Sequence, residues 1–307
     1  MSTIMGPGDL AKPEVNRGII HTDDRAGLMF ESLDNMSVDE SVTMLLYGGS
    51  GTGKTWFVAT AGPRTLIINI GNGLVTIQSP VVKKKYYKEG FPIVTTIHEE
   101  RDPQTGLFKS ADAFDKVCDA IDIALETFGD RFDTIAVDDA TQLRAFASNK
   151  ALEIGGMDNR SKTLEKAKKY GTVLMAQQDF LGEMNLIEQF VAGTVDLAKK
   201  HGKHFILTAH ERYIYKKMKD QQGKVIGEEI ERIRPAFTGK TFPDDVTGHF
   251  DLVWHMEVVA TGAGPVFRAH TEDYSRIRAK SRYPGVFKGV EPNPDFLKIV
   301  AAIKAAR

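Results

Sequence analysis

From about residue 40 onward, the chain alternates short apolar runs with longer segments in which apolar residues recur every three or four positions. The short runs predict strands, and the periodic segments predict helices with one buried face. This alternation is typical of a largely parallel sheet covered by helices on both faces, so the expected fold class is α/β. Strands are expected at residues 42–47, 65–70, 93–97, 134–137 and 203–208, with helices after Lys54, at 111–128 and from about 170 to 200.

The pattern changes after residue 210. Two strand-like runs, 212–218 and 225–233, flank a turn that contains Gly223, which predicts a projecting hairpin. Additional strands are expected at 252–259 and 266–270, in antiparallel arrangement near the C-terminus. The first 25 or so residues show no sustained periodicity, which is typical of a loosely held arm. The expected organisation is an arm at 1–25, one domain at 26–290 and a C-terminal segment at 291–307 whose helix covers 295–306.

A glycine-rich turn follows the first strand of the core and leads directly into a helical pattern. It reads Gly48-Gly49-Ser50-Gly51-Thr52-Gly53-Lys54-Thr55 and fits G-x-x-x-x-G-K-[ST]. Backbone N–H groups of such a turn curl around a phosphate at the positive end of the following helix. Lys54 is expected to reach the β- and γ-phosphates, and the Thr55 hydroxyl to hold Mg²⁺. The motif therefore predicts that the chain binds ATP with Mg²⁺.

Polar residues at two later strand ends complete the predicted site. Asp138 follows the apolar run 134–137 and is expected to orient Mg²⁺ through water. Asp139 has two possible roles: it positions the attacking water, or it caps the helix that follows. His210 follows the run 203–208 and is either a sensor of the γ-phosphate or an ordinary capped or solvated histidine.

The composition limits the cellular environments that suit the protein but does not identify a binding partner. The 307 residues include 42% hydrophobic residues, enough for a sizeable core, and 40 basic against 41 acidic residues, so any nucleic-acid contact must come from a local patch. The single cysteine, Cys118, lies in a helical pattern and is expected as a small buried side chain in a reducing cytosol. No apolar run has the length of a membrane span, so we expect a cytoplasmic protein without a membrane partner.

Taken together, the motifs resemble phage-encoded RecA/RadA-like nucleotide-binding proteins, a group that includes single-strand annealing recombinases. The resemblance runs from about residue 42 to 283. It implies a RecA-like P-loop ATPase core with a largely parallel central sheet, Mg·ATP, action in the host cytoplasm, and self-association as a ring or filament. Its carriers are the motif Gly48–Thr55, the run 134–139, Tyr170-Gly171, the run 206–211, Arg234-Pro235 with Gly239-Lys240, the run 250–253, and Ala279-Lys280-Ser281-Arg282.

The chain departs from this group where a catalytic glutamate is expected after the second core strand. The corresponding acidic positions are Asn69 and Gly71. Either Asp139, Glu99 or Glu211 replaces the missing base, or ATP acts mainly as a ligand that holds one conformation.

The resemblance also implies a catalytic role for Lys280 and Arg282, because similarly placed cations reach the γ-phosphate of a neighbouring subunit. If residues 276–282 are extended, their basic side chains share one face. The alternative is a solvated basic edge strand that charge protects from aggregation.

Two segments occupy the positions where RecA-like proteins bind DNA. They are residues 149–169 and the predicted hairpin, in which lysines lie beside Tyr213 and Tyr215. Lysine ammonium groups attract a phosphate backbone, and aromatic rings stack on unpaired bases. Lysine-rich loops are, however, often exposed to solvent without binding a ligand. The prediction is an ATPase that assembles on single-stranded DNA during phage-type recombination or annealing. The alternatives are a nucleotide-dependent assembly or regulatory protein without hydrolysis or DNA binding, a small-molecule kinase, and a helicase or packaging motor.

Overall fold

The computed structural model describes residues 19–23, 28–31, 40–71, 73–100, 103–104, 110–155, 177–262 and 264–307. The chain divides into two compact units, Met1–Glu40 and Ser41–Arg307. In the first unit, strand β1 (Ile19–Asp23) pairs antiparallel with β2 (Leu28–Glu31). Strand β1 falls within the 25 residues for which no regular element was expected. The predicted domain boundaries at residues 25 and 290 stay predictions.

A mostly parallel sheet forms the centre of the second unit, in the order β12-β10-β9-β3-β7-β6-β4-β5. Neighbouring strands from β9 to β5 run parallel, whereas β10 and β11 pair antiparallel with β9 and β12 pairs antiparallel with β10. The fold is therefore α/β with added antiparallel strands, as predicted. The strands are β3 (Thr43–Gly48), β4 (Thr65–Asn69), β5 (Ile93–Thr96), β6 (Thr134–Asp138), β7 (His204–Lys219), β9 (Leu252–Thr261), β10 (Gly264–His270), β11 (Lys280–Ser281) and β12 (Val290–Pro292).

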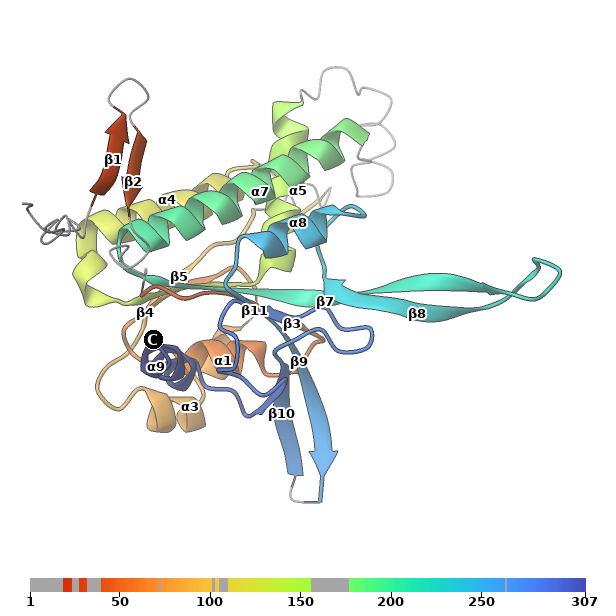
Figure 1. Ribbon diagram of the computed structural model, residues 1–307. Helices are drawn as coiled ribbons and strands as arrows, with labels where there is room; N and C mark the ends of the chain where they lie inside the picture. The colour runs from red at the N-terminus through yellow and green to blue at the C-terminus, as the bar shows by residue number, and fades with distance from the viewer. Residues whose placement is uncertain are drawn as a thin grey trace, which may run out of the picture. The chain divides into compact units, whose positions relative to one another are not determined.

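Helices cover both faces of this sheet (Figure 1). Successive side chains of a strand point to opposite faces, so Leu45 and Tyr47 of β3 pack on one side while Met44 and Leu46 pack on the other. The first side carries α4 (Ala113–Phe128), α5 (Ala140–Ile154), α7 (Gln177–Lys200) and α8 (Phe242–Gly248). The second side carries α1 (Lys54–Ala59), α2 (Leu74–Ile77), α3 (Pro80–Tyr86) and α9 (Phe296–Ala305).

Cys118 and helices α7 and α5 can each be compared with what the sequence predicts. Cys118 is half-buried against the core on α4, and burial raises the pKa of its thiol to about 11. The described part of helix α7 starts at Gln177, and the predicted start near residue 170 lies outside the described residues. The helix expected after Asp139 extends to Ile154 as α5, and its many polar residues obscure the period that its buried side chains follow.

Strand β7 does not end at residue 208. It runs without interruption from His204 to Lys219 and pairs antiparallel with β8 (Val225–Pro235). The prediction of separate strands at 203–208 and 212–218 was wrong, because the polar residues between them mark the point where β7 leaves the buried sheet and not an end of the strand. Figure 1 shows the β7–β8 hairpin extending well beyond the body of the sheet.

Candidate nucleotide-binding site

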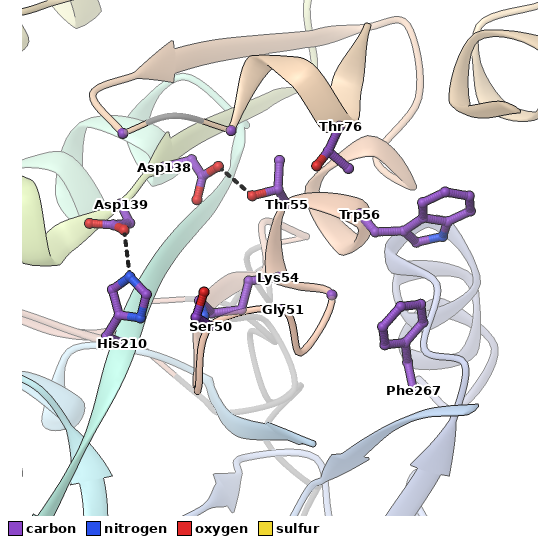
Figure 2. A pocket seen from close by; sticks show the side chains of 13 residues that line it. Ser50, Gly51, Lys54, Thr55, Trp56, Thr76, Asp138, Asp139, His210 and Phe267 are labelled. Carbon is purple, nitrogen blue, oxygen red and sulfur yellow. Dashed lines mark hydrogen bonds and ion pairs between the residues drawn. The ribbon is translucent and has the colours of Figure 1, made fainter. Parts of the chain in front are cut away.

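The glycine-rich loop joins the end of β3 to the start of α1. Gly51 and Gly53 have φ of 76° and 89°, a backbone region that favours glycine. A Cβ on Gly48 would lie 2.3 Å from the carbonyl oxygen of Met256, so the backbones of β3 and β9 leave no room for a side chain there. The loop borders a cavity of about 350 Å³ that is lined by Ser50, Gly51, Gly53, Lys54, Thr55, Trp56, Gly71, Gly73, Thr76, Asp138, Asp139, His210 and Phe267 (Figure 2).

Lys54 lies at the loop and is largely withdrawn from solvent. Its Nζ donates to the carbonyl oxygens of Gly48 at 2.9 Å and Gly49 at 2.7 Å. Burial lowers the pKa of Lys54, while the carboxylates of Asp139, Asp138 and Glu211 act in the opposite direction. The ammonium is thus held at the cavity by neutral carbonyls, next to the position that phosphates take in such a loop.

The Thr52 hydroxyl closes the loop on itself by donating to the carbonyl oxygen of Gly49 at 2.8 Å. Gly48, Gly49 and Thr52 therefore shape the loop without lining the cavity, whereas the other residues of the motif line it.

Asp138 accepts hydrogen bonds from two threonine hydroxyls. Thr55 Oγ1 lies 2.8 Å from Oδ2, and Thr208 Oγ1 lies 2.5 Å from Oδ1. Burial raises the pKa of Asp138, although both hydrogen bonds lower it. A Cβ on Gly73 would lie 2.3 Å from Asp138 Oδ2, so a glycine is required beside this carboxylate.

A carboxylate and a hydroxyl are the hard oxygen ligands that suit Mg²⁺, so Thr55 and Asp138 fit the ion. Among the described residues, no group of three or more His, Cys, Asp or Glu side chains is arranged to hold a metal. This agrees with Mg²⁺ sites that use one or two protein ligands together with substrate phosphates and water. Thr208 was not predicted from the sequence as a site residue. A hydroxyl residue inside the apolar run 205–209 is the signal that could have identified it.

Asp139 caps helix α5, as one of its two predicted roles requires. Its Oδ1 accepts from the backbone N–H of Gln142 at 2.9 Å, and its Oδ2 lies 3.3 Å from His210 Nε2. A Cβ on Gly71 would lie 3.8 Å from Asp139 Oδ2. The carboxylate therefore lies close to where a side chain at position 71 would project, and its catalytic role stays a prediction. His210 lines the cavity, where a γ-phosphate sensor must lie.

The other two carboxylates considered as replacements lie outside the set of described residues that line the cavity. Glu99 accepts from Asn149 Nδ2, at 2.6 Å. Glu211 binds His255 Nε2 at 2.7 Å and also accepts from the Tyr213 hydroxyl. Asp139 is therefore the candidate that the tertiary structure favours.

Lys280 and Arg282 are held away from the cavity of their own chain. Arg282 bonds Asp251 Oδ1 at 3.2 Å and the carbonyl of Gly248 at 2.7 Å, and Lys280 Nζ lies 3.4 Å from the same carbonyl. Only Lys280–Ser281 of residues 276–282 forms a strand, so the extended conformation that would put the basic side chains on one face is absent from this described segment. Turns there direct Arg276 to Glu229 and Arg278 to Asp273.

A strand, a glycine-rich loop and a helix, with a buried aspartate at the end of a parallel strand nearby, define a P-loop nucleoside triphosphatase. In this sheet β7 lies between the loop strand β3 and the aspartate strand β6. The chain belongs to the AAA domain family, whose model matches residues 40–283. No curated protein matches the chain.

Membership in this family supports a nucleotide-binding, ATPase-like function, typically with Mg²⁺. None of the helices in the described residues is long and apolar enough to cross a membrane.

Proposed function

We propose that the protein is a Mg·ATP-dependent ATPase whose nucleotide state controls its assembly on single-stranded DNA, in recombination or annealing of the phage type. The observation that carries this proposal is the continuity of β7. The strand places Thr208 against Asp138 and His210 at the cavity, and then Tyr213 and Tyr215 on the exposed hairpin. A change in the contacts of His210 therefore occurs on the same strand that carries the side chains proposed to bind DNA.

The cavity supports the chemical part of the proposal. Lys54 and the loop amides neutralise phosphate charge, and Thr55 with Asp138 hold Mg²⁺, which when bound supplies further positive charge to the phosphate oxygens. Asp139 Oδ2 accepts a hydrogen bond from the attacking water, while Oδ1 keeps the side chain fixed through the cap on α5.

The hairpin supports the DNA part. The side chains of Tyr213 and Tyr215 are exposed, with ring centroids 6.5 Å apart, so each presents an edge or face to an unpaired base. Lys216 and Lys217 are registered opposite Glu229 and Glu228 on β8, which reduces the positive field that they generate. Stacking therefore contributes a larger share of the proposed affinity than charge does. Residues 156–169 of the other proposed DNA segment lie outside the described residues.

A second candidate is a nucleotide-dependent assembly protein with little or no hydrolysis. Gly71 favours it, because no side chain at that position can act as a base. A kinase lid would instead need the cations of residues 276–282 at the cavity, and the structure places them on contacts elsewhere.

The test is ATP hydrolysis by the purified protein with and without single-stranded DNA, with Lys54→Ala as the blank. Turnover that DNA stimulates and Lys54→Ala abolishes is the expected result. ATP binding without turnover and without any effect of DNA would overturn the recombinase-like proposal in favour of the second candidate.

A further inference from the structure

A second cavity, of about 300 Å³, adjoins the one described above. The two share Gly53, Trp56 and Phe267 as walls. Lys85 and Tyr86 of α3 also line the second cavity. Its volume is at the lower end of the range for small-molecule sites, which suits part of a ligand more than a whole one.

The residues at the two ends of the first cavity indicate how a bound nucleotide would be oriented in it. Asp139 and His210 lie at one end, where the terminal phosphate and the attacking water belong, and Thr55 and Trp56 lie in the first turn of helix α1. Figure 2 shows Trp56 and Phe267 across the loop from Asp139 and His210. A triphosphate that extends along the loop from the catalytic end therefore brings its nucleoside out beside Trp56.

The aromatic walls are held in place before any ligand arrives. Trp56 Nε1 donates to the Tyr86 hydroxyl at 3.2 Å, and the two rings meet edge to face with centroids 5.9 Å apart. Lys85 Nζ lies 5.7 Å from the Trp56 ring centroid and 4.9 Å from that of Tyr86. These contacts fix the indole plane, so little side-chain freedom remains to be lost when a flat ligand stacks on it.

Phe267 comes from β10, on the opposite side of the shared opening. A Cβ on Gly53 would lie 2.7 Å from Phe267 Cδ1, so the ring packs directly on the loop and needs glycine there. Both Trp56 and Phe267 are only half-buried, although similar rings in this fold, such as Trp254, are fully buried. Two aromatic surfaces thus stay partly open at the point where the nucleoside emerges.

We propose that the second cavity binds the nucleoside part of the triphosphate, with the base stacked on Trp56 and Phe267. The proposal rests on the nucleotide binding proposed above and identifies the surface that recognises a base. Every base has a π-face, so stacking gives affinity with little discrimination among bases.

The test compares Mg·ATP with Mg-tripolyphosphate, which has the phosphates but no base, as ligands of Phe267→Ala. The affinity for ATP is expected to fall about five- to one-hundred-fold, the usual effect of removing a stacking ring. The affinity for tripolyphosphate is expected to change by less than about twofold. Phe91→Ala is the matched control, because Phe91 is 67% exposed and lies outside both cavities; it should leave both affinities unchanged.

Equal losses for both ligands would overturn the proposal, because they would show that Phe267 acts by supporting Gly53. No loss for either ligand would also overturn it and place the base elsewhere. If the unmodified protein binds tripolyphosphate as tightly as ATP, only the base site is refuted. If it binds neither, the proposed nucleotide function fails together with the base site.

Tryptophan emission gives an independent measurement. The chain has two tryptophans, and Trp254 is fully buried against Phe287, so a base in the second cavity should change the emission of Trp56. ATP, but not tripolyphosphate, is expected to quench the unmodified protein. Trp56→Phe should lose this response and keep its ATP affinity within about threefold, since phenylalanine also stacks. Quenching that persists in Trp56→Phe would contradict the proposal.

Discussion

At the scale of single residues, the cavity holds charges that water no longer stabilises. Asp138 is 4% exposed, and its raised pKa reflects this loss of solvation. Lys54 is 7% exposed, and its pKa is lowered for the same reason. Burial of these charged groups is costly to the protein without ligand, and the proposed Mg·ATP complex would compensate both charges.

Asp138→Asn should therefore stabilise the ligand-free protein. A folded-state pKa above the unfolded value means that the folded state binds more protons, so the free energy of unfolding falls as pH rises through the raised pKa. Asparagine has no such cost. We expect the Tm at pH 8 to rise by about 2–4 °C, the shift that ~1 kcal/mol gives in a domain of roughly this size, and the gain to shrink as pH is lowered.

The same variant should lose the additional stabilisation that Mg·ATP is expected to give the unmodified protein, since the carboxylate proposed to organise Mg²⁺ is gone. Asp133→Asn provides a control of opposite sign, because the hydrogen bond from Arg64 lowers the pKa of this exposed aspartate. Thermal unfolding at several pH values measures both variants. A lower Tm for Asp138→Asn at pH 8 would refute the expectation.

Two substitutions at Asp139 separate its structural role from its proposed catalytic one. Asparagine is as good a helix cap as aspartate, whereas alanine removes the cap at a cost of ~1 kcal/mol. Asp139→Asn should keep the Tm and lose about 10²- to 10⁴-fold in turnover, as expected when a general base is removed. Asp139→Ala should lose both. Unchanged turnover in Asp139→Asn would assign Asp139 to capping alone.

At the scale of elements, β7 has two different halves. Its first residues, such as Phe205 and Leu207, are fully buried between parallel neighbours, whereas Tyr215 and Met218 are exposed and paired only with β8 among the described strands. The change falls at His210, which lies opposite Gly48 at the start of the glycine-rich loop. One continuous strand thus joins the nucleotide cavity to the hairpin, and this makes the hairpin the part to test for DNA binding.

Replacing Lys216, Lys217 and Lys219 by alanine should weaken binding to single-stranded DNA and flatten its salt dependence. Each lost phosphate contact is expected to reduce the slope of log affinity against log salt by about 0.7. Tyr215→Ala should instead cost ~1–3 kcal/mol of binding free energy without changing that slope. Fluorescence anisotropy at several salt concentrations measures both effects.

Alanine at Lys199, Lys200 and Lys304 makes the same change in net charge on helices α7 and α9. This control should bind DNA as the unmodified protein does. If the two lysine variants behave alike, the hairpin is not the DNA surface, and only overall charge matters.

At the scale of the whole molecule, the catalytic role expected of Lys280 and Arg282 requires a residue from one copy to act on the nucleotide of another. Lys280 suits this test better than Arg282, which also pairs with the carboxylate of Asp251 in its own chain. Lys280→Ala is expected to lower turnover at least about tenfold, since a cation supplied in trans to the transferring phosphoryl group contributes roughly 10³–10⁵ in known cases.

Mixing Lys280→Ala with Lys54→Ala should restore part of the turnover. The first variant then supplies intact loops, and the second supplies intact Lys280 to its neighbours. Turnover of the mixture, measured against each variant alone, is the observation required. Two inactive variants that stay inactive when mixed would indicate that Lys280 does not act between copies.

The sequence by itself determined the α/β class, the glycine-rich loop and Asp138. Each of these features depends on contiguous residues. The alternation of apolar runs sets local conformation, and the motif places its amides, Lys54 and Thr55 in one turn. Local pattern also located the N-cap at Asp139 as one of two roles.

The tertiary structure alone decided which distant residues meet. It joined two predicted strands into β7, because pairing with β8 sustains the strand through polar residues that locally resemble an end. It also brought Thr208 to Asp138, Phe267 to Gly53 and Arg282 to Asp251. Such contacts depend on strand order and register, and a pattern of neighbouring residues encodes neither of them.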